Sequence, residues 1–172
     1  MSAVRPHACV PVGVVVERRK ATSHWLDMVW RPVAVLGGVP EVAPWTVLAA
    51  AEDAATFYVG ATAIELHRTE TDHYRSNLDS GAPSVWVALR PTGAEPPYAL
   101  FAVTADPAEG KSFTQAGDDL VEAVPMPSAV REIVAAFVAE HHVERPVYKR
   151  KRDCDCPKAL ARRAPMRKDR HE

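Results

Sequence analysis

Two cysteines near the C-terminus form the only closely spaced cysteine pair in the sequence, and such a pair could bind a metal or take part in redox chemistry. Cys154 and Cys156 are separated by one aspartate and flanked by Lys and Arg, which favour the thiolate that binds soft metals. Structural zinc and iron–sulfur sites need about four ligands, and no second cysteine pair completes such a set. A metal or sulfur site at Cys154 and Cys156 is therefore one hypothesis, and two incidental cysteines in a solvated tail is the alternative.

Four side chains in the middle of the chain could take part in acid–base chemistry if they faced a pocket: His67, Glu70, His73 and Tyr74. A general base also needs a positioned partner and a site for the substrate, and the sequence shows neither. The glycine-rich phosphate, dinucleotide and Gly-x-Ser-x-Gly nucleophile motifs are also missing from the sequence. We therefore predict no catalytic residue and no cofactor.

The charges are divided into two blocks of opposite sign. Residues 145–172 contain 11 Lys and Arg against 4 Asp and Glu, a net charge of +7, whereas residues 1–144 contain 10 against 18, a net charge of −8. The run Lys149, Arg150, Lys151 and Arg152 could neutralise phosphates, so a nucleic-acid-binding regulator is a second alternative. The acidic body would repel the same phosphates, which makes nucleic acid the less favoured partner and favours a tail that docks on a protein.

The composition also indicates where the protein works. Three cysteines do not form a disulfide framework, which fits a reducing compartment. The N-terminal apolar stretch contains Pro11 and Gly13 and has no basic start, unlike a secretory signal. No apolar run approaches the ~20 residues that span a bilayer. We therefore expect a cytoplasmic protein without membrane contact.

Short β-branched runs between Pro and Gly residues predict strands in the first half of the chain. The expected strands are 10–18, 31–36 and 45–49, followed by a hairpin of 56–59 and 62–67. In that hairpin Gly60 and Ala61 would form the turn, and Ile64 and Leu66 would face the core.

In the second half, residues 70–78 are expected to form a short helix with Tyr74 facing the core. Residues 84–90 and 98–104 read as neighbouring strands. The strongest helical pattern spans residues 127–142. Its apolar stripe consists of Val130, Ile133, Val134, Phe137, Val138 and His141. Pro127 suits the first helical position.

These elements predict an α+β fold with a mainly antiparallel sheet or a partly closed barrel. A C-terminal amphipathic helix would pack on the sheet and precede a disordered basic tail. The expected organisation is a flexible N-terminus over 1–9, one α+β domain over 10–143 and the tail over 144–172.

Several stretches together resemble a bacterial family of unknown molecular function that is encoded beside molybdenum- or tungsten-dependent formate dehydrogenase genes. The matching stretches lie in order within residues 10–152: 12–20, 30–36, 65–70, 74–78, 84–90, 124–127, 137–141 and 149–152. The resemblance implies a non-catalytic accessory protein that binds a formate dehydrogenase component or a maturation factor during assembly or cofactor loading. It carries over no catalytic residues.

Aromatic and Arg side chains supply most of the binding free energy at protein interfaces, so we use them to choose candidates for the contact surface. Trp25 lies in a polar loop and is the tryptophan expected at an interface, whereas Trp30 and Trp45 lie beside strands and are expected in the core. The full set of candidate contact residues is Glu17, Arg18, Arg19, Trp25, His67, Glu70, Tyr74, Lys149, Arg150, Lys151 and Arg152.

Overall fold

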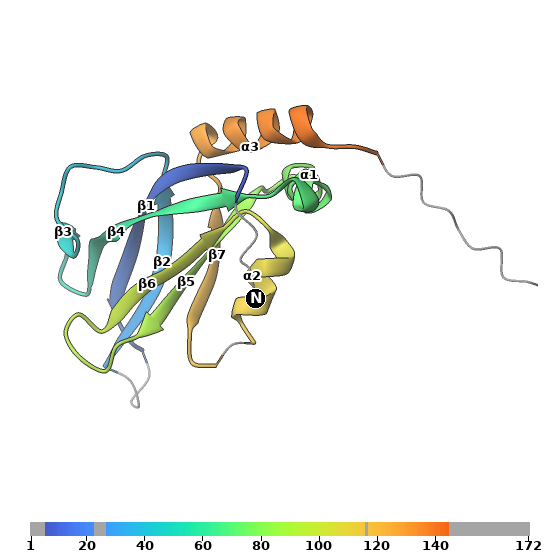
Figure 1. Cartoon of the computed structure of the whole chain (residues 1–172). Helices are drawn as coiled ribbons and strands as arrows, with labels where there is room; N and C mark the ends of the chain where they lie inside the picture. Colours follow the sequence, from blue (N-terminus) through green and yellow to red (C-terminus); the bar gives the residue numbers. More distant parts are fainter. Residues whose placement is uncertain (1–5, 23–26, 116, 145–172) are drawn as a thin grey trace, which may run out of the picture.

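The computed structural model describes residues 6–22, 27–115 and 117–144. Within these residues it contains two antiparallel sheets, one of four and one of three strands, together with three α-helices. The mixed α+β class predicted from the sequence is confirmed. Figure 1 shows the two sheets packed together, with the helices gathered toward one end.

The first sheet is built from the N-terminal half of the chain. Its strands are β1 (Ala8–Lys20), β2 (Met28–Leu36), β3 (Thr46–Ala50) and β4 (Ala54–Leu66), in the order β2-β1-β4-β3. Alternate residues of β1, from Val10 to Val16, are at most 3% exposed, because the alternating side chains of a strand place one set toward the core. Strand β1 begins two residues before the expected domain boundary at residue 10.

The second sheet consists of β5 (Ser84–Pro91), β6 (Tyr98–Thr104) and β7 (Leu120–Pro125), in the order β6-β5-β7. The central strand β5 buries Val85, Val87 and Leu89 completely. The predicted strands 84–90 and 98–104 and their pairing are confirmed. Strand β7 was not among the strands expected from the sequence.

The sheets contact each other through side chains, with β2 near β7 and β4 near β6. In the described part of the chain no backbone ladder joins an edge strand of one sheet to the other, so the sheets do not close into a barrel. The expectation of a partly closed barrel is therefore wrong. The valines of β1 and β5, with Ile64 and Leu66, form one continuous core between the sheets.

Strand β4 replaces the hairpin that the sequence predicted at Gly60 and Ala61. It continues through both residues and pairs with β1 along its whole length. The register shifts where Val14 faces Gly60 and Val15 faces Tyr58, and Gly60 has φ 150°. The glycine therefore serves a β-bulge, which needs the same backbone freedom as a turn.

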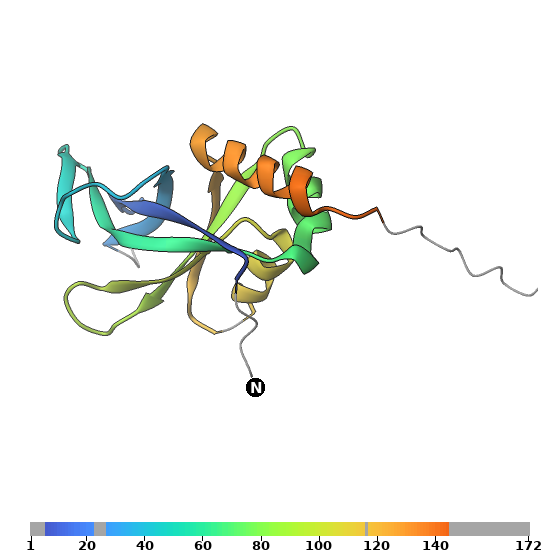
Figure 2. The ribbon, with the colours of Figure 1, turned by 45° about the horizontal axis from the view of Figure 1, so that its top comes forward.

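The three helices are α1 (Thr71–Leu78), preceded by a 3-10 turn η1 (Arg68–Glu70), α2 (Pro107–Phe113) and α3 (Ser128–His141). Helix α1 confirms the predicted short helix and buries Tyr74. Helix α2 was not predicted and packs against β5. Figure 2 shows α3 lying beside α1 at the end of the sheets.

Helix α3 covers a narrower apolar stripe than the sequence pattern suggested. Val130, Val134 and Phe137 are buried, but Ile133 is 46% exposed. The three buried residues belong to the same core cluster as the buried residues of both sheets, and α3 also packs against α1. Pro127 is the residue before the first helical turn and not the first helical residue.

Candidate functional site

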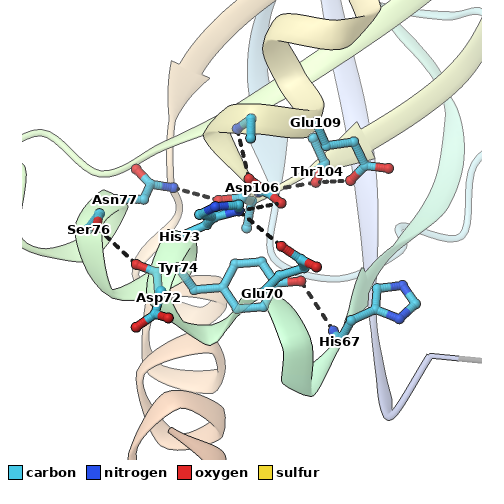
Figure 3. Close-up of polar contacts among 12 residues, drawn as sticks. His67, Glu70, Asp72, His73, Tyr74, Ser76, Asn77, Thr104, Asp106 and Glu109 are labelled. Carbon is cyan, nitrogen blue, oxygen red and sulfur yellow. Dashed lines mark hydrogen bonds and ion pairs between the residues drawn. The ribbon is translucent and has the colours of Figure 1, made fainter. Parts of the chain in front are cut away.

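A histidine and two carboxylates from separate segments converge beside α1. Glu70 ends the turn η1 and His73 lies three residues later on α1, a spacing that places both side chains on one face. Asp106 comes from the loop between β6 and α2. The His73 Nδ1 atom lies 3.1 Å from Glu70 Oε2 and 3.0 Å from Asp106 Oδ2 (Figure 3). We call these three residues the histidine–carboxylate cluster.

Asp106 is the most rigidly held member of this cluster and is 5% exposed. Its Oδ1 atom accepts a hydrogen bond of 2.7 Å from the Ala108 amide and so caps α2. Its own backbone amide donates to the Thr104 hydroxyl at 3.1 Å, and that hydroxyl donates to Glu109 at 2.6 Å. Oδ2 is therefore the oxygen turned toward His73.

Asn77 fixes α1 against the segment that carries Asp106. Its amide nitrogen donates to the carbonyl oxygens of Ser84 at 2.7 Å and Ala105 at 2.8 Å. Its side-chain oxygen accepts from the Ser84 amide at 3.0 Å. Because Asn77 is buried and all three bonds go to backbone groups, the separation of His73 and Asp106 is set by the fold.

The surroundings of His73 favour its protonated form. The hydrogen bond to Asp106 raises the pKa of His73, and the charges of Asp106, Glu70 and Asp72 add to this, while partial burial opposes it. A basic imidazole beside two carboxylates is well suited to holding a proton or a cation.

Tyr74, on the same helix, serves the core. Burial raises the pKa of Tyr74 to about 12, and its hydroxyl accepts a hydrogen bond from the His67 backbone amide at 3.1 Å. The phenol therefore stays neutral at physiological pH. The His67 ring points away from the cluster, with Nε2 3.8 Å from a Glu65 oxygen (Figure 3). Of the four candidate acid–base residues, the structure brings together only Glu70 and His73.

The predicted contact residues at the end of β1 are divided between two faces of the first sheet. Glu17 forms ion pairs with Arg19 at 3.0 Å and with Arg31 at 3.4 Å. Arg18 points to the opposite face, because successive strand residues alternate. Its guanidinium lies 5.6 Å from the ring centroid of Trp30 and 5.4 Å from that of Phe57.

Around Arg18 the rings form a connected group at the edge of the core. Trp30 lies 5.9 Å from Trp45, 5.5 Å from Phe57 and 6.2 Å from Tyr98. All four rings are partly buried and keep part of their surface exposed. We call Arg18, Trp30, Trp45, Phe57 and Tyr98 the aromatic surface.

An open hollow of about 530 Å³ adjoins this surface, lined by Trp30 and Tyr98 and by the loop between β5 and β6. Trp30 and Trp45 pack against the core, as predicted. The involvement of Phe57 and Tyr98 was not predicted.

The remaining predicted site residues lie outside the described residues. These are Trp25, the basic run Lys149, Arg150, Lys151 and Arg152, and the pair Cys154 and Cys156. The metal or sulfur hypothesis and the nucleic-acid hypothesis both depend on them and stay predictions. The expected flexibility of the N-terminus over residues 1–9 and the expected disorder of the tail over 144–172 also stay predictions, since most of both segments lies outside the described residues.

A family model described as "Protein of unknown function (DUF3305)" matches residues 11–151. The chain belongs to this family. Apart from the first three residues of β1, the match covers every strand and helix of the described residues, so the histidine–carboxylate cluster and the aromatic surface both lie inside the family region. No curated protein and no solved structure significantly matches the chain. None of the helices among the described residues has the length and apolar character needed to cross a membrane.

Proposed function

We propose that this DUF3305 protein is a non-catalytic accessory protein that binds a formate dehydrogenase component or a maturation factor in the cytoplasm. The choice of partner rests on the sequence resemblance described above. The observation that supports a binding role is the aromatic surface, where one arginine and four partly exposed rings meet beside an open hollow.

The composition of this surface is typical of interface hot spots. Trp, Tyr and Arg supply most of the binding energy at protein interfaces, and they do so where neighbouring side chains already hold them in place. The Arg18 guanidinium lies against both Trp30 and Phe57, whose rings also contact each other, so part of its side-chain entropy is already lost before binding. The hollow offers room for a side chain of the partner.

The experiment is a capture from the native host with the full-length protein as bait. The wild-type chain should enrich formate dehydrogenase subunits or maturation factors. Arg18→Ala and Tyr98→Ala should each weaken capture at least tenfold, consistent with the roughly 2 kcal/mol of a hot-spot residue. The matched control is Arg131→Ala, which removes an exposed arginine of α3 outside the aromatic surface.

Two results would contradict the proposal. If capture enriches neither formate dehydrogenase subunits nor maturation factors, the proposed partner is wrong. If the Arg18→Ala and Arg131→Ala variants are both shown to be folded by circular dichroism and capture the partner equally well, the aromatic surface is not the binding site.

Deletion of the gene separates the possible stages of action. Loss of formate dehydrogenase activity with molybdenum retained would indicate assembly, and loss of both would indicate cofactor insertion.

A further inference from the structure

The histidine–carboxylate cluster contains more negative charge than its own hydrogen bonds neutralise. The Nδ1 atom of His73 carries at most one hydrogen, yet two carboxylate oxygens lie at nearly equal distances from it, 3.1 and 3.0 Å. Within the described residues His73 is the cationic group that pairs with Glu70 and Asp106. The charges of Asp72 and Glu109 also act on this region.

Two of the three distances between the candidate ligand atoms match the spacing of ligand atoms around a metal ion. Glu70 Oε2, His73 Nδ1 and Asp106 Oδ2 all lie within 4.8 Å of one another. Bonds of roughly 2.0–2.2 Å to zinc place neighbouring ligand atoms about 2.8–3.6 Å apart in octahedral or tetrahedral geometry. The two distances from His73 already fall in this range, and the side chain of Glu70, which is 36% exposed, can complete it by a small rotation.

The shell around these atoms is built to hold the deepest ligand in place. The Asp106 side chain is 7% exposed, and Ala108 holds its other oxygen. Asn77 fixes the preceding residue, Ala105, to helix α1. Outer contacts of this kind orient ligands in metal sites and commonly change affinity 10- to 100-fold. On the other side, His73 is 45% exposed, so an ion can enter from solvent.

We propose that Glu70, His73 and Asp106 bind a divalent transition-metal ion, with Zn²⁺ the ion best matched to one imidazole and two carboxylates. Water fills the remaining positions, so the site has the open form of exchangeable or reactive zinc centres and not the closed form of structural ones. Metal binding requires Nδ1 of His73 to carry no proton. A neutral imidazole protonated at Nδ1 meets this requirement by moving its proton to Nε2, and a doubly protonated imidazole does so by releasing its Nδ1 proton to solvent.

The test must separate this site from Cys154 and Cys156, which also have metal-binding character. The full-length Cys154→Ser/Cys156→Ser protein is titrated with Zn²⁺ by calorimetry, and with Co²⁺ to record its absorption spectrum. We expect one equivalent of Zn²⁺, and a cobalt spectrum without the thiolate charge-transfer band that cysteine ligation produces.

Single substitutions in the same background identify the ligands. His73→Gln and Glu70→Gln should each weaken Zn²⁺ binding at least 30-fold. His67→Gln is the matched control, because it removes another histidine near a carboxylate, at 3.8 Å from Glu65, and should leave the affinity unchanged. Nitrogen-15 spectra of the imidazoles should show Zn²⁺ perturbing His73 Nδ1, a readout that a merely structural role would not give.

The proposal is overturned if the Cys154→Ser/Cys156→Ser protein, which keeps only Cys9, binds no equivalent of Zn²⁺. It is also overturned if the folded His73→Gln variant binds as well as its parent, or if the His67→Gln variant loses binding to the same extent. Thermal melts of each variant establish folding. If His73→Gln does not fold, Glu70→Gln decides the outcome, because its partly exposed side chain tolerates the change. None of these results depends on the formate dehydrogenase partner.

Discussion

Gly110 lets helix α2 lie directly on the indole ring of Trp86, and this contact allows a sharp test of the packing. A Cβ atom at position 110 would lie 2.3 Å from Cγ of Trp86 and 2.6 and 2.7 Å from two further ring atoms. Carbon atoms in contact are normally about 3.5–4.0 Å apart. Gly110→Ala therefore requires α2 to move outward by about 1 Å, or Trp86 to leave its position.

We expect Gly110→Ala to destabilise the protein, whereas the same substitution in a helix usually stabilises. Replacing a helical glycine by alanine ordinarily stabilises by about 1 kcal/mol. Overpacking typically costs about 1–3 kcal/mol, and moving α2 also loosens its contacts with β5. We expect Gly110→Ala to lower the free energy of unfolding by about 1–2 kcal/mol and the Tm by roughly 3–8 °C.

The assay is thermal and urea unfolding followed by circular dichroism, with a double-mutant cycle against Trp86→Leu. In the Trp86→Leu background, Gly110→Ala should be neutral or stabilising, because the ring that it clashes with has gone. A Gly110→Ala variant that is more stable than the wild type would refute the described packing of α2.

Three further predictions concern the core. Asn77→Ala leaves three backbone groups without their bonds and should cost about 3–4 kcal/mol in urea unfolding, whereas Ser76→Ala on the exposed side of α1 should stay within about 0.5 kcal/mol. Phe137→Asp buries a charge and should abolish the cooperative thermal transition, while Ile133→Asp, at a position 46% exposed, should cost less than about 1 kcal/mol. Because burial raises the pKa of Tyr74 above its ordinary value of 10.0 to about 12, the folded state keeps that proton longer than the unfolded chain. Stability should thus be full below pH 10 and fall by on the order of 2–3 kcal/mol between pH 10 and 12, and Tyr74→Phe should remove that part of the pH dependence.

The strands and the short helix could be predicted where one face alternates cleanly between core and solvent. The alternating apolar residues Val85, Val87 and Leu89 predicted strand β5, and Ile64 and Leu66 predicted the buried face of β4. The same reasoning failed at Gly60, because a hairpin turn and a β-bulge both favour a glycine with positive φ. The two can be told apart only by whether the strand continues past the glycine, as β4 does. Helix α2 has a start signal in Asp106 followed by Pro107, but it is too short for a periodic pattern.

The sequence could indicate Glu70 and His73 of the candidate site but not Asp106. Glu70 and His73 are neighbours in sequence and could be noticed as a pair. Asp106 lies 33 residues from His73, and their contact depends on how α1 packs against the loop after β6. The aromatic surface likewise combines residues from both sheets, whose relative placement no local pattern encodes.

Each of the two sheets is formed by one uninterrupted stretch of chain, residues 8–66 and residues 84–125. The N-terminal sheet can thus hydrogen-bond itself during translation, before the strands that cover its valine-rich face have left the ribosome. At 5–20 residues per second, the roughly 60 residues that complete the second sheet take about 3–12 s to synthesise. For those seconds the nascent chain presents an uncovered apolar surface, which is the kind of surface that makes folding intermediates prone to aggregate.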